Sequence, residues 1–181
     1  MKTLWKKGYR TLRWQVLDPN GDPLRYELAF RSEEQPGDWL PIASDLDEEQ
    51  YGFDATVLPD GLYRFRLTAA DSKGNQPEEA LTAERIGEPV VIDHSPPTLV
   101  SAVRQGDRLV VEVGDGLSPL REAMVSVDAG EWRPARAADG LLDGHAERLE
   151  IELSGSARLV LLRLTDAAFN DATVDLTRYL R

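Results

Sequence analysis

Three oxygen-bearing side chains at alternate positions of one short segment are the first candidates for chemistry in this sequence. Asp18, Asn20 and Asp22 stand two residues apart, and such oxygens match the first half of an EF-hand calcium loop. The second half fails, because Pro23 stands where that loop needs glycine and Ala29 where it needs a bidentate acid. Two interpretations stay open: a looser calcium site, or a turn whose Asp and Asn side chains accept backbone N–H groups.

A second group of polar residues, Asp139, Asp143, His145 and Glu147, also has a pattern that could hold a metal. On a strand, the last three side chains alternate with other residues and point the same way, offering two carboxylates and an imidazole to a divalent ion. The alternative interpretation is a solvated loop in an acidic protein.

The residue types needed for enzymatic chemistry are scarce. The chain has two histidines and no cysteine, which excludes disulfide, thiol and zinc-thiolate chemistry. It contains no Gly-x-Ser-x-Gly, no His-Glu-x-x-His and no phosphate-binding glycine loop. The sequence therefore predicts a protein that is not an enzyme and needs no cofactor, except that calcium stays possible.

Three tryptophans are the candidates for ligand binding: Trp5, Trp39 and Trp132. Exposed indole rings offer flat apolar surface together with a polar N–H group, so they could bind a sugar or a protein. Trp39 begins Trp-Leu-Pro and Trp132 begins Trp-Arg-Pro, so the two have similar contexts. The alternative is that both rings only pack across the edge of a sheet.

Composition narrows the class of partner. The chain has 181 residues, 41% hydrophobic and 29% charged, with a formal charge of −11. This balance is typical of a folded protein, and the negative charge argues against nucleic acid. The first fourteen residues are basic and hold no acid, which is typical of a guarded sheet edge or a basic arm. No apolar run approaches the ~18 residues that span a membrane, so no insertion is expected.

The hydrophobic pattern has a period of two over five segments: residues 12–16, 26–30, 63–69, 109–113 and 149–153. Strict alternation predicts antiparallel strands with one buried face and one solvated face. Turn residues separate the segments, and many short strands with turns between them favour a β-sandwich or a barrel. Helix is expected only over residues 78–84.

An internal repeat predicts the domain organisation. The alternating segment that ends at Asp18 recurs 97 residues later and ends at Asp115. In the same way, Asp71 recurs as Asp166 at a shift of 95. Consecutive prolines at 96 and 97 prevent a strand from running through this joint. We therefore predict an all-β chain of two tandem antiparallel β-sandwiches: residues 1–92, a Pro-rich joint at 93–98, and residues 99–181.

The first module resembles a fibronectin type III domain, a two-sheet sandwich. Trp14 stands where that family has its strand-B tryptophan, and Leu-Pro-Asp-Gly-Leu-Tyr at 58–63 resembles its tyrosine corner. The resemblance implies that the hydroxyl of Tyr63 bonds to backbone near Leu58 and locks the crossover between the sheets.

The second module resembles the Ig-like repeats of bacterial surface proteins. The motifs that carry this likeness are Asp-His-Ser-Pro-Pro-Thr at 93–98 and Val-Ser-Val-Asp-Ala-Gly-Glu-Trp at 125–132. Phe169 stands in place of the usual glycine, and Arg158 aligns with Tyr63, so no second tyrosine corner is expected.

Together the resemblances imply a non-catalytic module of a larger bacterial protein that is secreted, periplasmic or on the cell surface, with its export signal elsewhere. It would act as a spacer or a protein-binding rod beside the neighbouring domains of the longer chain. The alternative is an accessory module that binds a carbohydrate or protein ligand for an enzyme or receptor. Fold alone does not decide between these roles.

Overall fold

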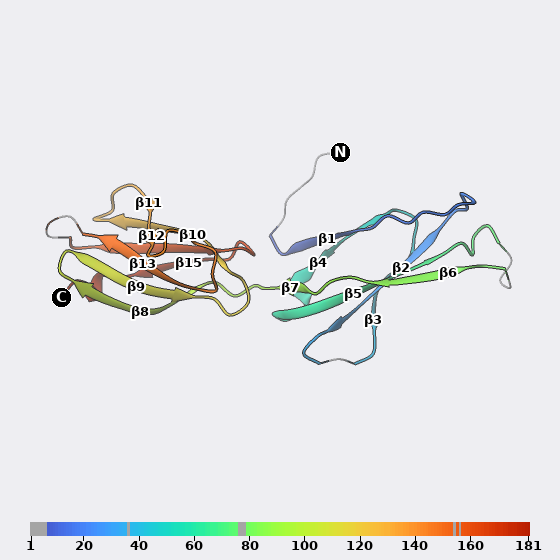
Figure 1. The fold of residues 1–181 in the computed structure, drawn as a ribbon, viewed down its shortest axis with the longest axis horizontal. Helices are drawn as coiled ribbons and strands as arrows, with labels where there is room; N and C mark the ends of the chain where they lie inside the picture. Colours follow the sequence, from blue (N-terminus) through green and yellow to red (C-terminus); the bar gives the residue numbers. More distant parts are fainter. Residues whose placement is uncertain (1–6, 36, 76–78, 154, 156) are drawn as a thin grey trace. The chain divides into compact units, whose positions relative to one another are not determined.

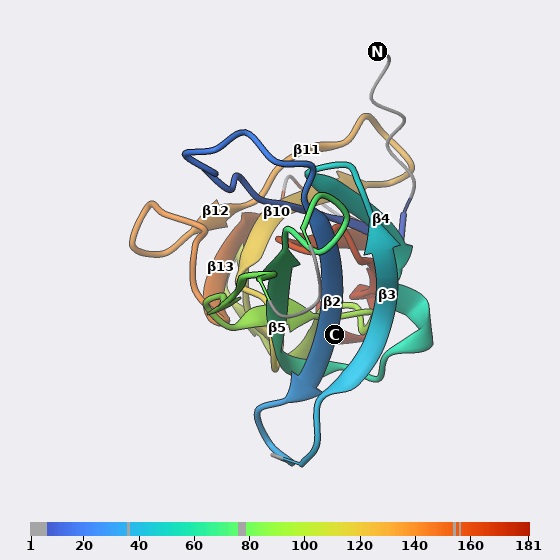
Figure 2. The same cartoon turned by 90° about the vertical axis from the view of Figure 1, so that its right-hand side faces the viewer.

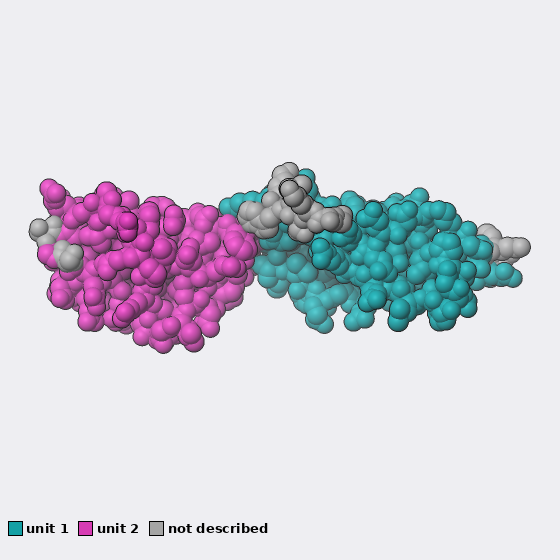
Figure 3. Space-filling model, turned by 90° about the horizontal axis from the view of Figure 1, so that it is seen from above, with its two compact units in different colours: residues 1–92 teal, residues 93–181 magenta. Residues whose placement is uncertain are grey.

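The chain is all-β and divides into two compact units. A computed structural model describes residues 7–35, 37–75, 79–153, 155 and 157–181. Unit 1 comprises residues 1–92 and unit 2 residues 93–181, which Figure 3 colours separately. Among the described residues, no helix is long and apolar enough to cross a membrane. Trp5 lies outside the described part of the chain.

Unit 1 pairs its strands antiparallel in two sheets. One sheet has the two strands β1 and β4, and the other has the order β3-β2-β5-β6, with β7 also paired to β5. Figures 1 and 2 show β2 between β3 and β5. The elements are β1 (Tyr9–Arg13), β2 (Arg25–Ser32), β3 (Leu40–Leu46), β4 (Gln50–Asp54), the 3-10 turn η1 (Ala55–Val57), β5 (Gly61–Ala70), β6 (Thr82–Ile86) and β7 (Val90–Ile92).

Unit 2 has two four-stranded antiparallel sheets. Their orders are β12-β13-β9-β8 and β11-β10-β14-β15. The elements are β8 (Thr98–Gln105), β9 (Arg108–Gly114), β10 (Leu120–Val127), β11 (Arg133–Pro134), β12 (Arg136–Ala137), β13 (Ala146–Glu152), β14 (Val160–Asp166), β15 (Asp171–Asp175) and the 3-10 turn η2 (Thr177–Leu180).

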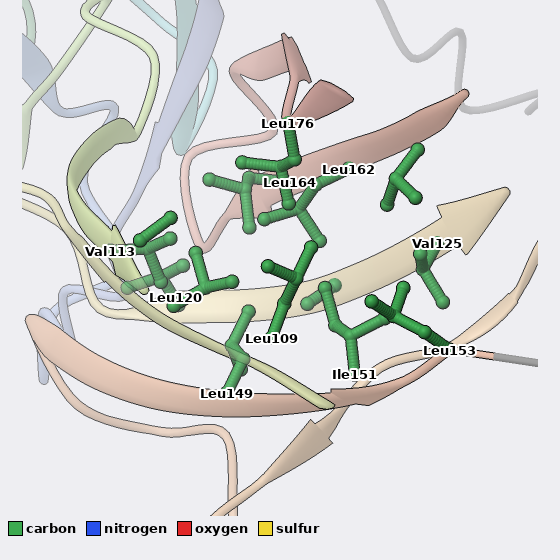
Figure 4. Close-up of a cluster of buried hydrophobic side chains, with 14 residues drawn as sticks. Leu109, Val113, Leu120, Val125, Leu149, Ile151, Leu153, Leu162, Leu164 and Leu176 are labelled. Carbon is green, nitrogen blue, oxygen red and sulfur yellow. The ribbon is translucent and has the colours of Figure 1, made fainter. Parts of the chain in front are cut away.

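The core of unit 2 lies between its two sheets, as the period of two requires. Alternate residues of β9 and β13 point from one sheet toward alternate residues of β10 and β14 in the other (Figure 4). The buried side chains that meet there include Leu109, Val111, Val113, Leu120, Val125, Leu149, Ile151, Val160, Leu162 and Leu164.

The core of unit 1 is smaller and less covered. Phe65 of β5 packs against Phe53 of β4 with ring centroids 5.5 Å apart, and Ile92 is fully buried beside them. Leu67 follows Phe65 on the same face of β5 but is only half-buried. A two-stranded sheet cannot cover the whole inner face of the wider sheet opposite, so part of that face stays open.

Three of the five alternating segments lie inside strands, namely β2, β5 and β9, and residues 149–153 extend one residue past the end of β13. The fifth, residues 12–16, overlaps only the end of β1, which stops at Arg13. The helix expected over residues 78–84 is wrong, although residue 78 itself lies outside the described part. Thr82–Ile86 forms β6 instead, because pairing with β5 outweighs the weak helical propensity of this segment.

Strand order matches between the units, with one difference that matters. The pair β1–β4 corresponds to β9–β13, and β3-β2-β5-β6 corresponds to β11-β10-β14-β15. In unit 2, β8 pairs along the other edge of β9, from Thr98 opposite Gly114 to Gln105 opposite Arg108. Among the described residues, β1 pairs only with β4, and no described strand of unit 1 corresponds to β8.

The packing of unit 2 gives a first prediction. Leu162→Ala should lower the free energy of unfolding by about 2–5 kcal/mol, because the side chain is fully buried and its loss leaves a cavity. The matched control is Leu141→Ala, since Leu141 of the same unit is 64% exposed and should change stability by less than about 0.5 kcal/mol. Urea denaturation measures both, and equal effects would contradict this description of the core.

Candidate functional site

Unit 1 has an apolar groove between its two sheets. It has a volume of about 500 Å³ and lies between the segment that contains the end of β1 and the strand β6. Its lining residues are Leu12, Arg13, Trp14, Gln15, Val16, Leu17, Leu28, Phe65, Leu67, Ala69, Ala83, Glu84, Arg85 and Gly87.

The position of the groove explains why it is open. In unit 2 the corresponding edge, that of β9, is paired with β8, whereas β1 has no described partner on that side. On the opposite wall, β6 is the outer strand of its sheet, and all five of its residues are exposed. An unpaired strand edge presents backbone N–H and C=O groups to any segment that approaches it.

The lining is apolar inside and charged at the rim. Leu28 and Phe65 are buried at the inner end, and Trp14 packs edge-on against Tyr26 at 5.4 Å between ring centroids. Leu17, in contrast, is 86% exposed. Arg85 pairs with Leu67 across β6 and β5, which directs its side chain to the groove side of the sheet. The groove therefore offers unused apolar area beside an inward-pointing charge.

Asp18, Asn20 and Asp22 lie in the loop between β1 and β2. The Asp18 carboxylate accepts the backbone N–H of Asn20 at 3.2 Å through Oδ1 and that of Asp22 at 2.7 Å through Oδ2. Gly21 has a φ of 73°, and Asn75 Nδ2 lies 3.5 Å from Asp22. This is the geometry of a turn closed by its own side chains. A calcium ion in this loop stays a prediction.

The second polar group also serves its own loop. Glu147 Oε1 accepts the backbone N–H groups of Asp143 at 3.0 Å and Gly144 at 2.6 Å. Asp139 accepts the N–H of Leu141 at 3.0 Å. Within the described ranges, these residues do not form a three-ligand cluster. The geometry is that of carboxylates that cap turns.

Trp39 and Trp132 stand directly before the corresponding strands β3 and β11, and arginines lie over both rings. The Arg31 and Arg66 guanidinium carbons are 4.6 and 5.0 Å from the Trp39 ring centroid. Arg163 is 4.7 Å from the ring of Trp132. Both tryptophans are half-buried. These cation–π contacts leave less ring surface for stacking on a sugar.

Tyr63 and Leu58 lie where β5 begins. The Tyr63 hydroxyl donates a hydrogen bond to the carbonyl of Pro59 at 2.9 Å, which is the type of contact that the family resemblance implies. Leu58 is 8% exposed and packs in the core of unit 1. Burial is the largest cause of a raised pKa at Tyr63, and the negative charges of Glu34 and Asp60 raise this pKa further.

Sequence reasoning missed the groove residues. Leu17 and Ala83 belong to short segments without strict alternation of apolar and polar residues. They line the groove only because no described strand pairs with the edge of β1 beside them. One signal was available in the second module. Residues 98–105 contain apolar residues and lead through a tight turn into β9, which indicates a hairpin partner for β9. No described segment stands in the same place before β1.

Comparisons with known proteins add little. The chain matches no family model, and no curated protein matches it significantly. It is similar to a solved structure, the chicken CNTN1 FN1–FN3 domains, at 17% identity and a TM-score of 0.35. That match covers 93% of this chain and 62% of the other, so this chain spans less than two thirds of the length of that structure. The fold assignment rests on the strand pairing described above.

The Tyr63 contact gives a second prediction. Tyr63→Phe should destabilise the protein by about 1–2 kcal/mol, because it removes a hydrogen bond and leaves the Pro59 carbonyl without its donor. Wild-type stability should also fall as pH rises above the unfolded tyrosine value of 10.0, since the folded pKa is raised, and the variant should lose less there. Tyr51→Phe, at a half-buried tyrosine of β4, is the control in urea denaturation. The same loss in both variants would contradict the role of the Tyr63 contact.

Proposed function

We propose that this chain is a non-catalytic protein-binding module, and that unit 1 binds an extended segment of another polypeptide in its open groove. One observation carries the proposal: an apolar groove of about 500 Å³ lies beside one edge of β1. In unit 2 the corresponding edge of β9 is paired with β8. Addition of a strand to a free sheet edge is a common mode of peptide recognition.

The shape and chemistry of the groove define the occupant. A strand that lies along β1, as β8 lies along β9, can exchange backbone hydrogen bonds with the edge of β1 that no described strand pairs. Its alternate side chains would then reach Leu67 and Ala69 on the groove side of β5. The occupant is therefore an extended segment with apolar residues at every second position.

The charged rim adds selectivity. Arg85 makes no ion pair with the described residues, and its side chain points to the groove. An inward-pointing charge of this kind disfavours non-specific strand pairing. A partner must therefore tolerate or neutralise this charge. The cations over Trp39 and Trp132 favour protein binding over sugar stacking as the function of this chain.

The wider setting of the chain rests on the family resemblances. We place it in a larger bacterial protein that is secreted, periplasmic or on the cell surface, where its neighbours would be further domains of that protein. The motifs at 58–63 and 93–98 support this setting.

Peptide binding tests the proposal. The probe is a fluorescein-labelled peptide with the β8 sequence Thr-Leu-Val-Ser-Ala-Val-Arg-Gln, titrated with the full chain and followed by anisotropy. Saturable binding is expected for wild type. Leu17→Asp should weaken it at least about tenfold, because burying a leucine contributes about 1.5–3 kcal/mol.

The matched control places the same change outside the groove. Leu141→Asp alters an exposed leucine of unit 2 and should bind the peptide like wild type. A scrambled peptide without alternation should not bind. Equal weakening by both variants, or no saturation at millimolar chain concentration, would reject the groove as a strand-binding site.

A further inference from the structure

Three aspartates from distant parts of unit 2 come together at one end of its sandwich. Asp93 is the first residue of the unit, Asp115 follows β9 directly, and Asp166 is the last residue of β14. Each offers a carboxylate oxygen, and the three oxygens lie within 4.8 Å of one another. Asp93 is 2% exposed, Asp166 is fully buried and Asp115 is half-buried.

Surrounding hydrogen bonds hold the carboxylates in place. Asp166 accepts both the backbone N–H of Asn170 at 2.8 Å and its side-chain Nδ2 at 2.9 Å, and the same Nδ2 donates to the Asp93 carbonyl at 3.2 Å. Asp115 Oδ1 accepts the N–H groups of Leu117 and Ser118 at 2.9 and 2.8 Å. The cluster is therefore ordered before any ligand arrives.

One oxygen of the cluster has no hydrogen-bond partner. Asp93 Oδ1 accepts the N–H of Ser95 at 3.0 Å, whereas Asp93 Oδ2 is buried and accepts no hydrogen bond from the described residues. Among the described residues, no arginine or lysine forms an ion pair with any of the three aspartates. A buried carboxylate oxygen without a donor or cation is costly, and two further acids beside it increase that cost.

The pKa of Asp93 reflects the same surroundings. Burial is the largest cause of its raised pKa, while the nearby Ser118 side chain and the hydrogen bond from the Ser95 N–H act to lower it. The negative charges of Asp115 and Asp166 raise the pKa further.

We propose that Asp93, Asp115 and Asp166 bind a calcium ion, with the unpartnered Oδ2 of Asp93 as a ligand. The donor set contains only oxygen, which hard cations prefer and which disfavours zinc or copper. Mg²⁺ keeps several of its waters and is usually bound through one or two carboxylates, whereas Ca²⁺ takes six to eight oxygens in a flexible geometry. Three carboxylates together therefore favour calcium, with water completing the shell.

This site differs from the loop that the sequence singled out. Asp18 and Asp71 are the residues of unit 1 that the repeat aligns with Asp115 and Asp166. Within the described residues of unit 1, no three acidic or histidine side chains approach one another in this way. The structure thus assigns calcium to unit 2.

Calcium binding to the full chain tests the site. Protein treated with a chelator is titrated with CaCl₂ by calorimetry, and melting is recorded with and without about 10 mM Ca²⁺, which exceeds typical dissociation constants of extracellular calcium modules. Wild type should bind one ion per chain in this cluster and melt several degrees higher with calcium. The same concentration of MgCl₂ should raise the melting temperature less.

Two isosteric variants separate the candidate sites. Asp93→Asn keeps an acceptor for the Ser95 N–H but loses the charge, so it should abolish the calcium shift without lowering the calcium-free melting temperature. Asp18→Asn should keep the full shift. If circular dichroism shows that Asp93→Asn is unfolded, Asp115→Asn replaces it. No binding by wild type, or an equal shift in wild type and the unit 2 variant, would overturn the proposal.

Discussion

The fold depends on one constraint: each sheet has an apolar face that must be covered by another element. Unit 2 meets it with four strands against four, and side chains such as Leu109 and Leu162 are fully removed from water. Unit 1 sets two strands against a wider sheet, so Leu67 stays half-buried and a groove remains beside β6. The difference between the two units is therefore one of coverage, and the binding surface we propose is the part of the core that unit 1 leaves uncovered.

Polar chemistry is placed where the sandwich needs no apolar side chains. Carboxylates at strand ends and loops accept backbone N–H groups, as Asp18 and Glu147 do, and this use alone explains most of the acidic loop residues. The Asp cluster of unit 2 goes further, because it gathers three acids and leaves Asp93 Oδ2 without a donor. A calcium ion there would connect the first residue of unit 2 to the ends of β9 and β14.

The sequence predicts the strands well where alternation is strict. Residues 63–69 lie inside β5, and residues 109–113 lie inside β9. It fails at β6, whose composition favours helix weakly and whose conformation is set by pairing with β5. The groove escapes prediction because it depends on a strand edge that no described strand covers. The Asp cluster could not be predicted for a related reason. The repeat drew attention to Asp115 and Asp166, but only the three-dimensional fold brings Asp93 beside them.

Hydrogen exchange of the backbone amides, resolved by strand, tests the unequal coverage of the two units most directly. Exposed and singly paired strands open more often than strands paired on both edges, so their amides exchange faster. The β1 amides should exchange at least about tenfold faster than those of β9, its counterpart in strand order. Equal protection of β1 and β9 would show that the edge of β1 is covered, and it would contradict both the open groove and the function we propose for it.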